Sequence, residues 1–285
     1  MIHQVITQWE GKAPIEQLCR VLQVSRSGYY AARAKRPSAT CLDSVRLQAA
    51  FEASGHCYGS RRLSAALNAQ GHQLGRYRVR TLMKRLHLKP RWKRKFVHTT
   101  DSKHNLPIAP NVLKRQFSPG AANEAWVSDL TYIRTASGWL YLAAVMDLYS
   151  RKIVGWAMSA SMPAQLVCQA LDMAIGSRKP APGLLIHSDR GCQYASAEYT
   201  RFVNQHGFVA SMSGKGNCWD NAVMERFFLN LKMERVWQNQ YANHSEARKD
   251  IADYIVNFYN STRLHSTLNY KSPMQFESTP QTTEL

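Results

Sequence analysis

The sequence lacks long hydrophobic runs and closely spaced cysteines. Its longest apolar run, Trp139 to Met146, is far shorter than the roughly 20 residues that a membrane helix needs, so we expect no membrane span. The six cysteines are scattered without a Cys-x-x-Cys pair, which excludes the usual spacing of a zinc knuckle or a disulfide scaffold. The N-terminus has no basic segment followed by an apolar stretch, so we expect no secretory signal and a cytoplasmic location.

Acidic residues are scarce in the first part of the chain. Residues 1–120 hold 22 basic and 5 acidic residues, whereas residues 121–285 hold 15 and 14. A solvated surface carries charges of both signs, so a one-sided excess indicates a polyanionic partner. Nucleic acid fits better than an acidic membrane, because the basic residues lie within helical patterns and beside no apolar anchor.

Apolar residues recur at helical spacing throughout this basic part. The pattern over residues 12–34 predicts a helix, a turn and a short helix, and a trio of helices is predicted over residues 43–54, 60–70 and 76–88. The last helix of the trio is basic around most of its circumference, which suits a duplex groove. We expect DNA contacts from this helix and from the start of the helix before it, through Arg61, Arg62, Arg76, Arg78, Arg80, Lys84 and Arg85.

The hydropathy pattern changes after residues 96–121, a proline-containing segment that is typical of a linker. Strand-like runs at residues 125–133, 139–148 and 152–158 predict a three-stranded antiparallel meander. A helix, a strand, a helix, a strand and a helix are predicted next, over residues 164–176, 184–186, 196–207, 209–212 and 221–235. This order predicts an α/β fold, a mixed sheet with helices on both faces, preceded by an all-α helix-turn-helix region.

Three acidic residues occupy positions from which their side chains can meet. Asp129 lies within the first predicted strand, Asp189 ends the fourth, and Glu225 lies on the helix at 221–235. A carboxylate among apolar neighbours is costly unless a charge compensates it, and the hard cations Mg²⁺ and Mn²⁺ prefer oxygen ligands. The set therefore indicates a site for phosphoryl transfer with two metal ions about 4 Å apart.

These carboxylates belong to longer motifs. The motifs are Trp126-x-x-Asp129-Leu-Thr-Tyr132, His187-Ser-Asp189-x-Gly191-x-x-Tyr194 and Gly216-Asn-x-x-Asp220-Asn-Ala222-x-x-Glu225-x-Phe227, followed by Leu231-Lys232-x-Glu234. Between Asp189 and Glu225 lie 35 residues. In these motifs the sequence resembles the DDE transposases of bacterial insertion sequences, and more closely the second-reading-frame product of the group whose catalytic domain is similar to retroviral integrase. Three further motifs extend the resemblance over nearly the whole chain: Tyr58-Gly-Ser-Arg-Arg-Leu63, Arg78-Val-Arg-x-Leu-Met83 and Tyr259-Asn-x-x-Arg263-x-His265-x-x-Leu268-x-Tyr270-x-x-Pro273.

The resemblance implies an RNase H-like core in which Asp129, Asp189 and Glu225 hold the metal ions. It also implies that Lys232 contacts DNA at the end of the element. Glu225 and Lys232 are two helical turns apart, so both project from one face of their helix. We expect four regions: a helix-turn-helix-like segment at 1–40, a basic helix-turn-helix DNA-binding domain at 41–95, the linker at 96–121, and an integrase-like catalytic core with a C-terminal helix at 122–285.

Three polar residues near the carboxylates have other expected roles. Asp147 is predicted to be structural, and Asp220 is predicted to be the N-cap of the helix that carries Glu225. Asn221 lies one turn before Glu225, so it either faces the DNA with Glu225 or serves the start of the helix.

The expected activity is that of a transposase, which cuts and joins DNA strands at the ends of an insertion sequence and so carries out DNA transposition, recombination and integration. The expected partners are double-stranded terminal repeats, target DNA and further copies of this chain on that DNA, at the bacterial nucleoid. In the resembled group an upstream reading frame supplies another helix-turn-helix and a leucine zipper. Because this chain has no sustained heptad, we expect it to need that product, or fusion to it, for full recognition of the ends.

Three alternative functions remain open at this point. A DNA-binding regulator of the element would bind DNA and never cut it. A nuclease of the RNase H type would cut RNA in hybrids and never join ends, although it has no need for the basic helices. A protein of acidic membranes would need large apolar residues opposite the basic ones, and no such stripe is present.

Overall fold

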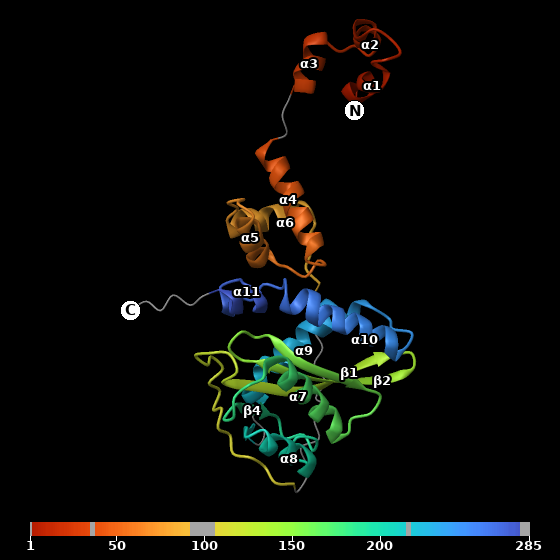
Figure 1. Ribbon diagram of the computed structural model, residues 1–285. Helices are drawn as coiled ribbons and strands as arrows, with labels where there is room; N and C mark the ends of the chain where they lie inside the picture. The colour runs from red at the N-terminus through yellow and green to blue at the C-terminus, as the bar shows by residue number, and fades with distance from the viewer. Residues whose placement is uncertain (1, 35–37, 92–105, 215–217, 280–285) are drawn as a thin grey trace, which may run out of the picture.

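Two groups of helices precede the sheet in the computed structural model, which describes residues 2–34, 38–91, 106–214 and 218–279 (Figure 1). The first group is α1 (Ile2–Trp9), α2 (Ile15–Val21) and α3 (Arg26–Ala34), packed around the buried side chains of Ile6, Cys19 and Tyr29. The predicted helix, turn and helix over residues 12–34 correspond to α2 and α3. The helix α1 was not among the predicted elements, and it buries the side chain of Ile6.

The second group of helices contains the predicted trio. It consists of α4 (Ala39–Ala53), α5 (Ser60–Ala69) and α6 (Arg76–Arg85). Ser38 begins α4 as its N-cap, because its hydroxyl accepts a hydrogen bond from the amide of Cys41 at 3.2 Å. The three helices bury an apolar core that includes Leu47, Leu63 and Val79. Within the described residues, no helix is long and apolar enough to span a membrane.

A five-stranded mixed sheet forms the centre of the rest of the chain. Its strands are β1 (Ala125–Thr135), β2 (Gly138–Asp147), β3 (Ile153–Ser159), β4 (Leu185–Ser188) and β5 (Val209–Met212), and their order across the sheet is β3-β2-β1-β4-β5. The first three strands pair antiparallel, as the predicted meander required. β4 and β5 pair parallel, with β4 beside β1. This mixed order confirms the predicted α/β architecture.

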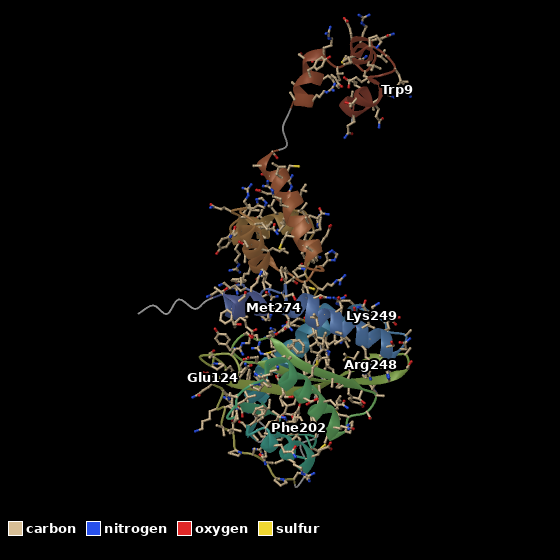
Figure 2. The ribbon with its side chains drawn as sticks, in the orientation of Figure 1. Trp9, Glu124, Phe202, Arg248, Lys249 and Met274 are labelled. Atoms are coloured by element: carbon tan, nitrogen blue, oxygen red, sulfur yellow. The ribbon has the colours of Figure 1, made fainter. Side chains whose placement is uncertain are left out.

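Helices cover both faces of the sheet. Alternate residues of β2 point to opposite faces, and each set is buried against a different pair of helices. Leu140, Leu142 and Ala144 face α9 (Ala222–Glu234) and α10 (His244–Asp253), whereas Ala143 and Val145 face α7 (Ala164–Arg178) and α8 (Ala197–Gln205). Phe202 of α8 packs against the core between the sheet and α7. Arg248 and Lys249 project from the outer side of α10 (Figure 2). A short 3-10 helix, η1 (Cys218–Asn221), leads into α9.

The last described residues return to the sheet and hold its β3 side. The short helix η2 (Val236–Gln238) precedes α10, and η3 (Tyr254–Asn260), η4 (Ser266–Leu268) and α11 (Pro273–Ser278) follow it. Asn260 hydrogen-bonds both backbone groups of Ile153 at 2.9 Å. Glu277 of α11 accepts from Arg178 at 2.7 and 2.9 Å and from Lys152 at 3.0 Å. These contacts join the C-terminal segment to β3 and α7.

Asp147 belongs to the same network. Its side chain is fully buried, and it accepts hydrogen bonds from the amides of Asn123 and Tyr149 and from Arg178. Every one of these contacts holds a turn or a strand end, so the predicted structural role of Asp147 is confirmed.

Candidate active site

Asp129 and Asp189 lie at equivalent positions on two neighbouring strands. β1 and β4 run parallel, and their last paired residues are Val127 and His187. Each aspartate lies two residues beyond its paired residue, so Asp129, within β1, lies beside Asp189, which directly follows β4. Neighbouring strands are about 4.8 Å apart, which brings the two acidic groups into one site.

The turn after β4 holds Asp189 in place. Its Oδ1 accepts the amide of Gly191 at 2.8 Å. A side chain at residue 191 would place its Cβ 3.0 Å from that same oxygen and 3.2 Å from Gln193, so the turn leaves little room for any residue other than glycine. The glycine in the second motif is thereby explained by a close approach of the backbone to the carboxylate.

Glu225 reaches the site from the other side. It lies in the first turn of α9 and its side chain is exposed. The start of α9 contacts β1, because the amide nitrogen of the Asn221 side chain lies 3.4 Å from the carbonyl of Ser128. This contact places the first turn of α9 beside Asp129.

The three carboxylates interact electrostatically. Burial raises the pKa of Asp129 well above its ordinary value, and the negative charges of Asp189 and Glu225 raise it further. The hydrogen bond from the amide of Leu130, at 2.7 Å, and the positive charge of Lys232 oppose this rise. The site therefore concentrates negative charge at Asp129 and includes one nearby cation.

Lys232 is held against an aromatic ring. Its Nζ lies 4.6 Å from the centroid of the Tyr132 ring, and burial lowers its pKa while the charge of Asp129 opposes that shift. Tyr132 was not among the predicted site residues. Its position in the Asp129-Leu-Thr-Tyr132 motif was the available signal, since the motif continues along β1 beyond the carboxylate.

A divalent cation fits the donor set in its chemistry. The donors are carboxylate oxygens, which hard cations prefer, and a cation would offset the repulsion that raises the pKa of Asp129. Among the residues that the structure describes, no three His, Cys, Asp or Glu side chains stand close enough together to hold a metal as they are placed.

The prediction that Asp220 caps α9 is wrong. Asp220 lies within η1 and is 2% exposed, and its carboxylate accepts hydrogen bonds from the amide of Gly214, from Asn111 and from Arg115 at 2.7–2.9 Å. Burial acts to raise the pKa of Asp220, but the Gly214 amide and Arg115 outweigh it and keep that pKa low. Asp220 therefore ties the loop after β5 to residues 111–115, partners too distant in sequence for a local pattern to reveal.

Asn221, not Asp220, occupies the N-cap position of α9. Its side chain makes no capping hydrogen bond there, and it is 4% exposed. Its Oδ1 is buried and has no hydrogen-bond partner among the described residues. Asn221 therefore does not cap the helix, and its side-chain amide instead donates to the carbonyl of Ser128 on β1. Its contact with DNA stays a prediction.

The basic residues of α6 lie opposite its buried face. Val79, Leu82 and Met83 are buried, and the exposed predicted DNA contacts on this helix are Arg76, Arg78, Arg80, Lys84 and Arg85. Arg61 of α5 is also exposed, whereas Arg62 is partly buried, and burial together with the charge of Arg263 lowers its pKa.

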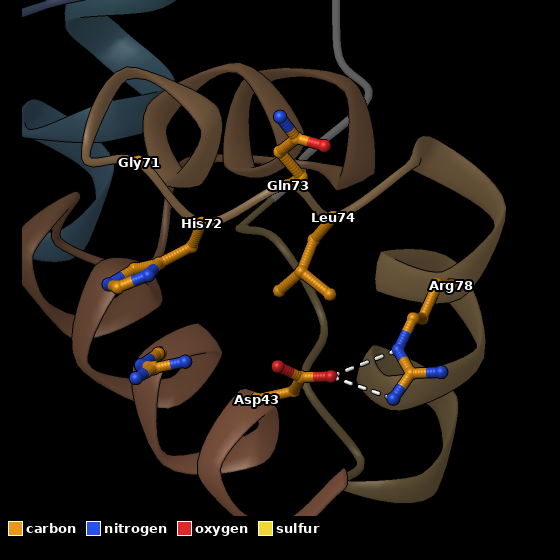
Figure 3. Close-up of a pocket in the computed structure, with 7 residues that line it drawn as sticks. Asp43, Gly71, His72, Gln73, Leu74 and Arg78 are labelled. Atoms are coloured by element: carbon orange, nitrogen blue, oxygen red, sulfur yellow. Dashed lines mark hydrogen bonds and ion pairs between the residues drawn. The ribbon is translucent and has the colours of Figure 1, made fainter. Parts of the chain in front are cut away.

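Arg78 differs from the other arginines of α6 because it is paired. Its Nε and Nη2 donate to one oxygen of Asp43, at 3.0 and 2.7 Å (Figure 3). The pair lines a cavity of about 380 Å³ together with Arg46, Gly71, His72, Gln73 and Leu74. Arg78 thus braces α6 against α4, at the edge of a basic hollow.

Comparisons with known proteins agree with this geometry. An HTH-like domain model matches residues 42–96, and two integrase core domain models match residues 119–218 and 206–273. The chain is 44% identical over 263 residues to "Insertion element IS600 uncharacterized 31 kDa protein" of Shigella sonnei, covering 91% of this chain and 97% of that protein. It is 39% identical over 285 residues to "Transposase InsF for insertion sequence IS3A" of Escherichia coli (strain K12), covering 98% and 99%.

A solved structure shares the fold. The simian T-cell lymphotropic virus intasome in complex with PP2A regulatory subunit B56 gamma contains a chain that matches with a TM-score of 0.50 and 16% identity, over 78% of this chain and 73% of that one. At this identity the match supports the RNase H-like, integrase-type fold and nothing beyond it.

Proposed function

Because the chain belongs to the insertion-sequence transposases with an integrase core, we propose that Asp129, Asp189 and Glu225 are its catalytic carboxylates. An integrase-type core implies use of a divalent metal, and we assign two Mg²⁺ or Mn²⁺ ions to these three side chains. When bound, the ions would stabilise charge on the attacking and leaving oxygens of a phosphodiester. The observation that carries the assignment is the placement of Asp129, within β1, beside Asp189, directly after the parallel strand β4, with Glu225 close enough to influence Asp129.

The proposed reaction has two steps of one type. Water attacks the phosphorus at the end of the element, the bond from phosphorus to the 3′ oxygen breaks, and a 3′-hydroxyl is released. That hydroxyl then attacks a phosphodiester of the target strand, forms the new bond and displaces the target's own 3′ oxygen. The residues of this chain orient the two oxygens, and Lys232 binds a phosphate of the element's end beside the carboxylates.

The N-terminal helices supply the DNA-binding surface in this proposal. A helix-turn-helix-like domain and a transposase core together imply DNA binding, and we assign the contacts to the exposed basic face of α6 and to Arg61. We further propose that several copies assemble on the terminal repeats and the target at the nucleoid, and that the upstream-frame product, or fusion to it, completes recognition of the ends. The basic excess in residues 1–120 supports phosphate contacts of this kind.

The test is a cleavage and joining assay on a labelled duplex that carries the terminal repeat, with Mg²⁺ or Mn²⁺. Wild type should nick and join only with metal, and Asp189→Asn should bind the duplex normally while losing at least a hundredfold in both reactions. Asp172→Asn, an exposed aspartate on α7, is the matched control and should behave as wild type. A wild-type chain that binds but never cuts, even when fused to the upstream product, would support a regulator instead.

A further inference from the structure

The DNA-binding helices rest on the far end of the chain. Tyr58, in the turn between α4 and α5, is 6% exposed, and its hydroxyl donates to the carbonyl of Thr262 at 3.3 Å and accepts from the amide of Leu264 at 2.8 Å. More than 200 residues separate these partners in sequence. We call these two hydrogen bonds the Tyr58 anchor. Figure 1 shows the same arrangement, with α4–α6 seated beside the segment that runs from α10 to α11.

Apolar and charged contacts surround the Tyr58 anchor. Phe258 and Leu264 pack against the buried core of α4–α6. The guanidinium of Arg62 lies 5.7 Å from the centroid of the Tyr58 ring, and it experiences the charges of both Arg263 and Glu234. The contact therefore combines buried hydrogen bonds, apolar packing and charge, and it differs from a loose tether between two domains.

The segment that receives Tyr58 is itself fixed to the catalytic helix. Arg263, which is 1% exposed, donates two hydrogen bonds to Glu234 of α9, at 2.7 and 2.8 Å. The hydroxyl of Tyr254 donates to the same carboxylate at 2.6 Å. Glu234 is the last residue of α9, the helix that carries Glu225 and Lys232. A continuous set of buried contacts thus runs from Tyr58 through residues 262–264 to α9.

We propose that Tyr58 is a positioning residue, which holds the DNA-binding helices in one placement relative to the catalytic carboxylates and so determines which phosphodiester is cut. This inference rests on the proposed function, since it assumes that α6 binds the duplex and that Asp129, Asp189 and Glu225 cut it. A duplex held by α6 at a fixed distance from α9 presents one phosphodiester to the carboxylates. A duplex held by loosely placed helices presents several neighbouring ones.

The experiment compares the full-length wild type with Tyr58→Phe on an end-labelled duplex carrying the terminal repeat, with cut positions mapped at single-nucleotide resolution. The variant removes the hydroxyl and keeps the ring. We expect the share of cuts at the main position to fall at least threefold and to move to neighbouring phosphates, while the Kd for the duplex stays within about twofold. Tyr30→Phe, which changes a 45% exposed tyrosine on α3, is the matched control and should keep the wild-type cut pattern.

A second measurement does not depend on cleavage. Spin labels on the exposed thiols of Cys41 in α4 and Cys192 next to the site, with Cys57 and Cys218 replaced by alanine, report the distance between the two parts. The distance distribution should be narrow with Tyr58 and broader in Tyr58→Phe.

The outcomes separate the two proposals. If wild type cuts and Tyr58→Phe gives the same cut positions and the same distance distribution, the positioning role is overturned and the proposed function stands. If wild type binds the duplex and cuts nowhere under any metal, the proposed function fails and the positioning role fails with it.

Discussion

The ammonium group of Lys232 lies over the ring of Tyr132, 4.6 Å from its centroid, beside the carboxylate of Asp129. The ring of Tyr132 is in turn met edge-on by Trp139, at 5.0 Å between centroids. Tyr132 and Trp139 come from paired strands of the sheet, whereas Lys232 comes from α9. The sheet thus provides a rigid aromatic support for a cation that we assign to DNA binding.

Removing that support should weaken catalysis. A cation–π contact contributes about 0.5–2 kcal/mol, so Tyr132→Leu should slow strand cleavage by about 2- to 30-fold. Tyr132→Phe keeps the ring and should cleave at nearly the wild-type rate. The measurement is the single-turnover cleavage rate of the wild type, Tyr132→Leu and Tyr132→Phe. Equal rates for the two variants would show that the ring does not support Lys232.

The buried pair of Arg263 and Glu234 should be far more important for stability than a surface pair. Arg263→Met leaves the Glu234 carboxylate buried without its cation, which should lower the free energy of unfolding by about 3–5 kcal/mol. Arg235 pairs with Asp250 and Asp253 at the surface, so Arg235→Met should cost about 1 kcal/mol or less. Urea unfolding of both variants measures the difference. Similar losses in the two would contradict the assigned burial.

His265 should make the protein less stable as the pH falls. Burial lowers its pKa to about 2, and the charges of Arg263, Arg62 and Arg151 contribute to this. Below pH about 6.5 the unfolded chain binds a proton at this residue that the folded chain does not, so the free energy of unfolding falls by about 1.4 kcal/mol per pH unit.

The measurement is urea unfolding of wild type and His265→Gln at several pH values between 7.5 and 5. Above pH 7 the variant shows only the constant cost of the substitution. Between pH 6.5 and 5 the free energy of unfolding of the wild type should fall more steeply than that of His265→Gln, by about 1.4 kcal/mol per pH unit. Parallel curves would mean that His265 titrates in the same way in the folded and unfolded chains.

The contact between β3 and α7 has no room for a side chain at Gly155. A Cβ there would lie 2.3 Å from the carbonyl oxygen of Ala170 and 2.8 Å from the Cβ of Ala174. Gly155→Ala should therefore lower the free energy of unfolding by about 1–3 kcal/mol or more. Gly176→Ala, in α7 with nothing within 4 Å, should raise it by about 0.5–1 kcal/mol. Thermal unfolding of Gly155→Ala and Gly176→Ala measures both the sign and the size of the change in the free energy of unfolding.

Salt dependence should identify the residues of α6 that contact phosphates. Each phosphate contact contributes about 0.9 to the slope of log K against log salt concentration, so Arg80→Ala should reduce the magnitude of the slope by about that amount. Arg201→Ala, an exposed arginine on α8, should leave the slope unchanged. Binding titrations of a terminal-repeat duplex at several salt concentrations measure this slope. An unchanged slope for Arg80→Ala would show that Arg80 does not contact a phosphate.

Local sequence patterns were sufficient for much of the fold. The three strand-like runs at residues 125–133, 139–148 and 152–158 predicted the antiparallel meander of β1, β2 and β3. Asp129, Asp189 and Glu225 were predicted from motifs, and the parallel register of β1 and β4 supplies the physical reason that two of them adjoin.

The missed features depend on partners that are distant in sequence. Asp220 binds Arg115, Glu234 binds Arg263, and Tyr58 binds residues 262 and 264, across separations that no periodicity encodes. In each case the sequence shows an ordinary polar residue near a helix end. Only the packed chain reveals that its partner is a buried group on another element.

The order in which a ribosome makes this chain gives the Tyr58 anchor another consequence. Residues 39–85 emerge and can fold long before residues 262–264, to which Tyr58 binds, have been translated. A polypeptide that ends before residue 262 would therefore keep the basic surface of α6. It would lack both the buried Arg263–Glu234 pair and the hydrogen bonds between Glu277 and Arg178. Under the proposed function, such a truncated product would carry the basic face of α6 without the elements that place it relative to α9.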